Sequence, residues 1–271
     1  MDNLKKDEIR QAVRENYGKV ALSANEGSCC SSSSCCGSGK SPTAEDISMA
    51  LGYSNEDVTS VPGGANMGLG CGNPQAIAAL KPGETVLDLG SGGGFDCFLA
   101  AKAVGSDGFV IGVDMTAEMV SKARNNAAQT DYNNVEFRLG EIEHLPVADN
   151  SVDVIMSNCV INLSPDKKQV FQEAFRVLKP GGRLAISDVV AVAEMPEEVK
   201  QDIALYAGCI SGASLIGDVE SMLVAVGFVE VRLTPKEESK EFIRTWFPGR
   251  NIENYITSAA IEAVKPIYEA K

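Results

Sequence analysis

Residues 86–100 read VLDLGSGGGFDCFLA, and this stretch decides the fold. The apolar run before the glycines predicts a buried strand, and the residues after them predict a helix. Glycines at such a turn let the backbone approach a ligand closely, and the start of the helix offers unpaired N–H groups with a partial positive charge. The stretch therefore predicts a cradle for a nucleotide-containing cofactor.

On both sides of this cradle, strand-like and helix-like segments alternate from Gly83 onward. We predict strands at 84–89, 109–114, 134–138, 152–157, 183–190 and 228–233, and helices near 95–104, 116–129 and 166–178. The strand segments are continuous apolar runs, which is typical of a parallel sheet covered on both faces. The chain is therefore expected to be α/β and doubly wound, with mostly parallel strands.

The remaining segments are less regular. A helix is predicted over 3–17, and Thr43 and the three residues after it look like a capping box that starts a short helix. Residues 178–182 (LKPGG) are expected to be a helix end followed by a turn. Other predictions are a Ser-, Gly- and Cys-rich arm at 24–41, a mostly helical segment at 196–226 with a break at 211–214, and a final segment, 254–264, that could be strand or helix.

Composition excludes several classes of function. The 271-residue chain carries a net charge of −13, which disfavours binding to nucleic acid or to an anionic membrane. No apolar run is long enough to span a bilayer, and the N-terminus does not look like a secretory signal, so we expect a cytoplasmic protein whose thiols stay reduced. His144 is the single histidine, so a histidine-based triad or a multi-histidine metal site is impossible.

The cradle favours S-adenosylmethionine over a dinucleotide. The glycines of Gly90-Ser91-Gly92-Gly93-Gly94 follow a G-x-G-x-G pattern, and Asp88 lies two residues before the first of them. A carboxylate there suits a cationic amino-acid group and would repel a pyrophosphate. Asp114, at the end of the next predicted strand, can accept hydrogen bonds from both ribose hydroxyls, and Met115 beside it belongs to the same predicted site.

Two further motifs extend the pattern beyond the cradle: GEIEHLPVADNSVDVIMSN (140–158) and VLKPGGRLAISD (177–188). With them the chain resembles the class I S-adenosylmethionine-dependent methyltransferases over residues 73 to about 234. The resemblance implies a seven-stranded Rossmann-like sheet. It also implies that Glu141 and Ile142 flank the adenine and that Asn158 lies near the methionine portion of the cofactor.

Eight cysteines are distributed unevenly, with two adjacent pairs in the early arm and four single residues later. Cys71 precedes the cradle, Cys159 follows the fourth strand, and Cys209 lies in an insertion after the fifth. Ligands of parallel sheets bind outside the carboxyl ends of the strands, so these three thiols could converge beside the cofactor. Cys97, on the helix after the cradle, is interpreted as a small buried apolar residue.

Converging thiolates suit soft ions. Zinc takes four ligands in a closed site, or three with an open position. Trivalent arsenic takes three sulfurs and keeps a lone pair that is itself a nucleophile. Methyl transfer to that lone pair needs no base to remove a proton, so the scarcity of histidine does not count against it.

A narrower resemblance rests on NYGK (16–19), ANMGLGCGNP (65–74), GSGGGFDCFLAA (90–101), MSNCVINLSPDK (156–167), the segment around Cys209 and the early cysteines. These motifs resemble the arsenite methyltransferases. The resemblance implies that Cys71, Cys159 and Cys209 coordinate As(III) and that an early cysteine takes part. The candidates are Cys29, Cys30, Cys35 and Cys36, and their arm could deliver As(III), supply electrons or have no function.

We therefore expect residues 1–60 to form a helix and Cys-rich arm, and residues 61–271 a methyltransferase domain with an arsenic-binding insertion at about 191–226. The expected function is methylation of arsenite and then methylarsenite with S-adenosylmethionine, for detoxification, without a permanent metal. Arsenite or its thiol adducts would be the substrate, and thioredoxin or glutathione the reductant. The alternatives are a small-molecule C- or O-methyltransferase and a non-catalytic thiol-based As(III) binder.

Overall fold

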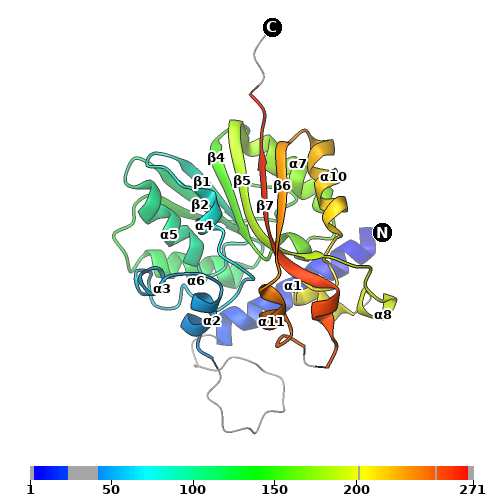
Figure 1. The fold of residues 1–271 in the computed structure, drawn as a ribbon. Helices are drawn as coiled ribbons and strands as arrows, with labels where there is room; N and C mark the ends of the chain where they lie inside the picture. The colour runs from blue at the N-terminus through cyan, green and yellow to red at the C-terminus, as the bar shows by residue number, and fades with distance from the viewer. Residues whose placement is uncertain (1–2, 24–41, 201, 248, 268–271) are drawn as a thin grey trace.

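A seven-stranded sheet forms the centre of the computed structural model, which describes residues 3–23, 42–200, 202–247 and 249–267 (Figure 1). The strand order is β3-β2-β1-β4-β5-β7-β6. The strands are β1 (Thr85–Leu89), β2 (Phe109–Asp114), β3 (Val135–Leu139), β4 (Val152–Asn158), β5 (Leu178–Ala191), β6 (Val229–Lys236) and β7 (Ile256–Val264). The first five run parallel, whereas β7 is antiparallel to both of its neighbours. The predicted doubly wound α/β class is confirmed.

Helices cover both faces of this sheet. They are α1 (Asn3–Ser23), α2 (Ala44–Ala50), α3 (Asn55–Thr59), α4 (Gln75–Ala78), α5 (Phe95–Val104), α6 (Ala117–Ala127), α7 (Lys167–Val177), α8 (Glu197–Lys200), α9 (Ile203–Ala207), α10 (Ile216–Val226) and α11 (Ser239–Ile243), with short 3-10 turns at Ile161–Leu163 and Ile252–Asn254. Val86 of β1 belongs to an apolar cluster with residues of α5 and α6, whereas Leu87 belongs to the cluster that includes residues of α7 and α10. This alternation along one apolar strand is what a sheet buried on both faces requires.

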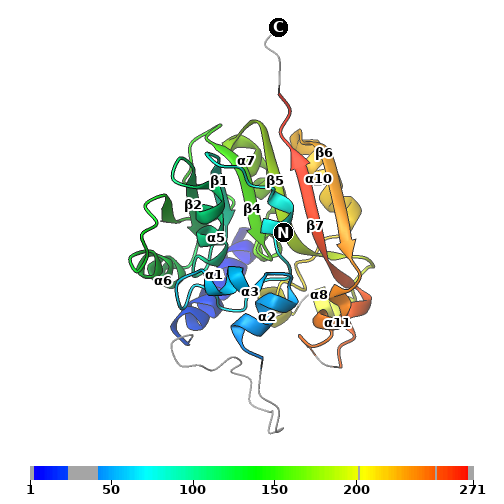
Figure 2. The same ribbon diagram turned by 60° about the vertical axis from the view of Figure 1, so that its left-hand side comes forward.

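One end of the sheet is covered by a further group of helices. Figures 1 and 2 show α1, α2 and α11 gathered at this end, which is where the parallel strands finish. Helix α1 packs against α6 and α9. Thr43 caps α2 as predicted, because its hydroxyl accepts the Asp46 N–H while the Asp46 carboxylate accepts the Thr43 N–H.

Two predictions for local structure need correction. Residues 178–182 do not form a turn after α7. They begin β5, and the ladder to β4 is irregular between the pairs Val152–Leu178 and Val154–Arg183. Pro180 has no N–H to donate and the following glycines allow an irregular backbone, so the segment forms an interrupted strand. The predicted helical segment 196–226 consists of three helices, of which only α10 exceeds five residues.

Candidate active site

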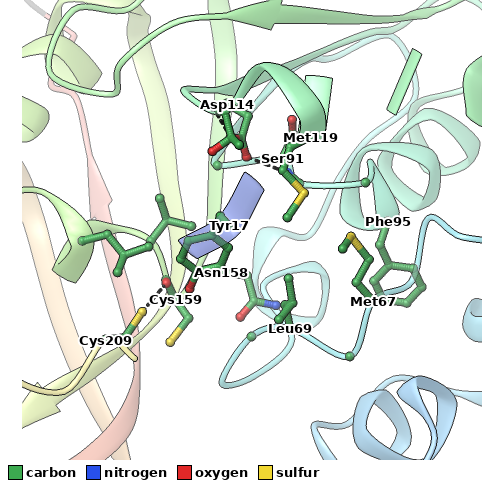
Figure 3. Close-up of a pocket in the computed structure, with 18 of the residues that line it drawn as sticks. Tyr17, Met67, Leu69, Ser91, Phe95, Asp114, Met119, Asn158, Cys159 and Cys209 are labelled. Atoms are coloured by element: carbon green, nitrogen blue, oxygen red, sulfur yellow. Dashed lines mark hydrogen bonds between the residues drawn. The ribbon is translucent and has the colours of Figure 1, made fainter. Parts of the chain in front are cut away.

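A cavity of about 660 Å³ opens at the carboxyl ends of the parallel strands. Its wall includes the residues that directly follow β1, β2 and β4, together with side chains from α1, α2, α5 and the region of α11. Figure 3 shows that Asp114 and Ser91 lie in one part of the cavity and that Cys159 and Cys209 lie in another. A cavity of this volume is large enough for a small-molecule cofactor and a substrate.

The glycine turn after β1 lines the part of the cavity that contains Asp114 and Ser91, which we call the cofactor end. Gly92 has a φ of 51°, and an added Cβ would meet no atom within 4 Å, so its α-carbon faces open space. The Gly92 N–H donates to Asp114 Oδ2 at 2.9 Å, while Asp114 Oδ1 accepts the Thr116 N–H at 2.8 Å. The hydroxyl of Ser91 is buried and has no hydrogen-bond partner in the described part of the chain. An open backbone and an unpartnered hydroxyl fit a polar cofactor.

Two buried carboxylates stand beside this turn. Asp88 lies at the end of β1, and its Oδ2 accepts a hydrogen bond from the Cys97 thiol at 3.2 Å. Asp96, on the first turn of α5, accepts a hydrogen bond from the Tyr53 hydroxyl at 2.8 Å. Burial raises the pKa of Asp88 well above its usual value and raises that of Asp96 to about 6. Carboxylates held in this way favour a cationic partner.

Three thiols gather at the other end of the cavity. The sulfurs of Cys71 and Cys159 and a carboxylate oxygen of Asp188 lie within 4.8 Å of one another. The Cys209 thiol donates to the backbone carbonyl of Cys159 at 2.9 Å. All three cysteines are buried, and Cys159 and Cys209 line the cavity directly. The structure therefore brings together the three cysteines that the sequence placed near the strand ends.

The backbone at two of these cysteines is unusual. Cys159 has a φ of 59° and Cys209 a φ of 63°, in the left-handed region that residues with a Cβ rarely adopt. Such a conformation costs roughly 1–2 kcal/mol for each residue. Glycine would avoid this cost but would supply no thiol.

The thiols influence one another and the groups around them. Contacts with the Cys209 and Cys71 thiols, followed by burial, raise the pKa of Cys159 well above its usual value. Burial also raises the pKa of the Cys71 thiol and raises that of Asp188 to about 6. Asp188 is held by the N–H groups of Ile161 and Val189. Both shifts favour the protonated forms of the Cys71 and Cys159 thiols.

Helix α1 closes one side of the cavity, and the sequence pattern did not predict this. Its Arg10 and Tyr17 line the wall. The Arg10 Nη2 atom lies 3.2 Å from Glu143 Oε1, and the Tyr17 hydroxyl donates to the carbonyl of Ala207 at 3.3 Å. Burial, followed by the nearby thiols of Cys209 and Cys159, raises the pKa of Tyr17.

An apolar wall completes the thiol end. Phe242, Trp246 and Phe247 come from α11 and the residues after it, and Leu69 comes from the loop that carries Cys71. The rings of Phe242 and Trp246 pack edge to face, with centroids 5.3 Å apart. Trp246 and Phe247 pack against the apolar cluster that contains the three cysteines, which limits the contact of the thiols with water.

Most of the predicted cofactor residues line this cavity: Asp88, Gly90, Ser91, Gly92, Asp114, Met115, Ile142 and Asn158. Gly94 is the N-cap of α5 beside them. Glu141 instead forms ion pairs with Arg10 and Arg14 of α1. His144 is exposed, and Cys97 is buried as expected. Cys29, Cys30, Cys35 and Cys36 lie outside the described residues.

Comparison with known proteins agrees with this geometry. Residues 80–242 match the family model of a methyltransferase domain. The arsenite methyltransferase of Halobacterium salinarum is 55% identical over 265 residues, which cover 96% of this chain and 67% of that protein. The chain belongs to the arsenite methyltransferase family. The Mus musculus arsenite methyltransferase is 36% identical over 87% of this chain and 63% of its own length.

A solved structure supports the same assignment. The crystal structure of an arsenic(III) S-adenosylmethionine methyltransferase from Chlamydomonas reinhardtii superposes with a TM-score of 0.63 at 33% identity, over 84% of this chain and 75% of that chain. The chain spans between 61% and 67% of the length of the Halobacterium, Mus musculus and Homo sapiens relatives. No helix in the described residues combines the length and apolar character needed to cross a membrane.

Proposed function

We propose that this chain methylates trivalent arsenic, with S-adenosylmethionine as the methyl donor. The observation that carries the proposal is the meeting of Cys71, Cys159 and Cys209 at one end of a cavity whose other end is the glycine turn. Family membership supports the same reading, because the related proteins are named for this activity. Detoxification of arsenite would be the biological purpose.

In this proposal the three cysteines hold the substrate. Each As–S bond forms as arsenic releases one of the ligands with which it arrived, and the proton of the protein thiol leaves with that ligand. Three sulfurs leave the lone pair of As(III) free, so the nucleophile carries no proton and needs no base. The exposed position of His144 is compatible with this chemistry.

The cofactor end positions the second reactant. S-adenosylmethionine supplies a methyl group activated by a positively charged sulfur. Asp88 would face its ammonium group and Asp114 its ribose, and the Gly92 turn leaves the space that the cofactor requires. Holding both reactants in one cavity would supply most of the rate enhancement, since proximity and alignment replace acid–base work.

A reductant completes the cycle. Methyl transfer to the lone pair leaves arsenic pentavalent, and two electrons from a pair of thiols return it to the trivalent state as those thiols form a disulfide. Thioredoxin or glutathione would then reduce that disulfide. Among Cys29, Cys30, Cys35 and Cys36, one or more could take part in arsenic delivery or in this redox step.

The direct test is an assay on the purified chain with arsenite, S-adenosylmethionine and a thiol, followed by chromatographic separation of the arsenic species. We expect methylarsenite first and dimethylated arsenic later. S-adenosylhomocysteine should accumulate in step with the methyl groups transferred. As(III) that binds without S-adenosylhomocysteine formation would contradict the enzymatic function and leave only a binding role.

A further inference from the structure

Asn158, at the carboxyl end of β4, holds the backbone on both sides of Cys71. Its Oδ1 accepts the Cys71 N–H at 3.1 Å, and its Nδ2 donates to the Gly72 carbonyl at 2.9 Å. An amide side chain can accept and donate at once, so one residue satisfies two groups of the same loop. In Figure 3, Asn158 lies between Cys159 on one side and Phe95 on the other.

The loop that carries Cys71 is packed directly against this amide. Gly70 has a φ of 125°, and an added Cβ would lie 2.8 Å from both Nδ2 and Oδ1 of Asn158. Contacts this short cannot be made without a shift of one group or the other. The Asn158 side chain therefore leaves no room for a Cβ at Gly70, and the loop passes directly against the amide.

The same amide reaches the carboxylates of the cofactor end. Asn158 Nδ2 lies 3.1 Å from the Tyr53 hydroxyl oxygen and 3.4 Å from Asp96 Oδ2. The Tyr53 hydroxyl donates to Asp96 Oδ1 at 2.8 Å. A partly buried set of hydrogen bonds thus runs from Asp96 through Tyr53 and Asn158 to Cys71, and we call these four residues the amide bridge.

Asp96 and Asp88 are two buried carboxyl groups beside the glycine turn. Both are more than nine-tenths buried, and both line the cavity. No ion pair among the described residues includes either carboxylate. Burial, and then the charge of Asp96, raises the pKa of Asp88. Buried carboxylates of this kind are stabilised by a cation placed between them.

We propose that Asp96 is a second carboxylate for the ammonium group of S-adenosylmethionine. The amide bridge then makes the conformation of the Cys71 loop depend on whether this ammonium group is bound. The proposal rests on the proposed function, since it takes Cys71 as an arsenic ligand. An ammonium group on Asp96 holds Tyr53 and Asn158 in one arrangement, and that arrangement fixes the Cys71 backbone. The cofactor and As(III) therefore bind with positive coupling, which must be reciprocal.

The test uses S-adenosylhomocysteine, which keeps the ammonium group but has no methyl group to transfer. Its affinity for the protein is measured by calorimetry, and As(III) affinity is measured by equilibrium dialysis with and without it. The variants are Asp96→Asn, which removes the charge, and Tyr53→Phe, which removes one oxygen of the bridge. Tyr132→Phe, outside the cavity, is the matched control.

We expect S-adenosylhomocysteine to tighten As(III) binding to the wild type about tenfold, a usual size for coupling between two sites. In Tyr53→Phe, S-adenosylhomocysteine should increase the As(III) affinity by less than about twofold. The variant should keep most of its own affinity for S-adenosylhomocysteine. Asp96→Asn should weaken S-adenosylhomocysteine about tenfold through the loss of a charge-assisted hydrogen bond. Tyr132→Phe should match the wild type in both measurements.

Each failure has a different meaning. Wild-type protein that binds no As(III) contradicts the proposed function, and the affinity of Asp96→Asn for S-adenosylhomocysteine still tests the carboxylate. If the As(III) affinity of the wild type is the same with and without S-adenosylhomocysteine, the coupling is overturned. Equal coupling in Tyr53→Phe and Tyr132→Phe overturns the amide bridge. If Asp96→Asn fails to fold, Tyr53→Phe remains the deciding variant, because it removes a single hydroxyl.

Discussion

The two ends of the cavity are built in different ways. The centre of the cofactor end comes from one contiguous stretch, in which β1, the glycine turn and the first turn of α5 supply Asp88, Gly92 and Asp96, and Asp114 of the neighbouring strand β2 is joined to it through the Gly92 N–H. The thiol end is assembled from three remote segments, and Cys209 donates to the carbonyl of Cys159 from fifty residues away along the chain. A local motif can therefore form the first end, whereas the second depends on the whole sheet.

The backbone shows the same contrast. Left-handed backbone at the cofactor end occurs at Gly90, Gly92 and Gly94, where it costs little. At the thiol end it occurs at Cys159 and Cys209, where a Cβ makes it unfavourable. Strain that persists in a cavity is a reason to suspect function. The difference teaches that the cofactor end uses backbone shape and the thiol end uses side-chain chemistry.

The largest expected effect tests the thiol end. Replacing Cys159 or Cys209 with Ser removes one sulfur and misplaces the arsenic, and misplacement of a reacting atom costs about 100-fold in rate. We expect arsenite methylation, measured by chromatography of arsenic species, to fall by at least that factor in each variant.

The control for these variants is Cys97→Ala, scored by As(III) bound per protein rather than by turnover, because Cys97 contacts Asp88. Its arsenic stoichiometry should equal that of the wild type. Full methylation by both serine variants, or arsenic lost from Cys97→Ala alone, would mean that the thiol end has been assigned to the wrong cysteines.

The second effect concerns the carboxylates. The pKa of Asp96 is raised from its usual range to about 6, so the stability from its protonated form is present at about pH 4 and is lost as pH rises through 6. Asp96→Asn does not ionise there. Relative to the wild type, the variant should gain roughly 2 kcal/mol in free energy of unfolding between pH 4 and pH 8, measured by urea denaturation without cofactor.

Asp107→Asn, in the exposed turn between α5 and β2, provides the comparison for that experiment. The free energy of unfolding of this variant should not increase relative to that of the wild type between pH 4 and pH 8. A pH-independent difference for Asp96→Asn would show that its carboxylate does not ionise within the fold as described.

The third effect tests backbone shape at the cofactor end. Gly92 and Gly83 both have positive φ, 51° and 84°, and an added Cβ would meet no atom within 4 Å at either. Alanine at either position should cost about 1 kcal/mol of stability. Only Gly92→Ala places its methyl group in the cavity, so calorimetry should show S-adenosylhomocysteine affinity about tenfold weaker for Gly92→Ala and unchanged for Gly83→Ala.

The smallest effect concerns the closure of the cavity by α1. Arg10 pairs with Glu143, whose side chain is 3% exposed, whereas Lys102 pairs with Glu56, whose side chain is 80% exposed. Arg10→Met should lower the free energy of unfolding by roughly 1 kcal/mol, and Lys102→Met by less than about 0.5 kcal/mol, because water screens the second pair. Equal losses in thermal or urea unfolding would indicate that α1 is not held by this ion pair.

Local sequence determined most of the elements and the cofactor cradle. The predicted strand 84–89 is found at Thr85–Leu89, and the predicted helix 95–104 at Phe95–Val104. Apolar runs, glycines and caps act over a few residues, so the local structure that they favour can be predicted from residues close together in the sequence. The same locality explains the failure at 178–182, where Pro and Gly indicated a turn but pairing with β4 made an irregular strand.

Only the tertiary structure decided the assembly around that cradle. The segment 254–264 became β7 because β5 and β6 both pair with it, which no local pattern could specify. The topology rule predicted that three cysteines would approach the strand ends, but it could not predict that Asp188 would join them or that Tyr53 and Asn158 would link Asp96 to Cys71. Such contacts depend on side-chain directions that are set when remote segments pack, and packing is a property of the whole chain.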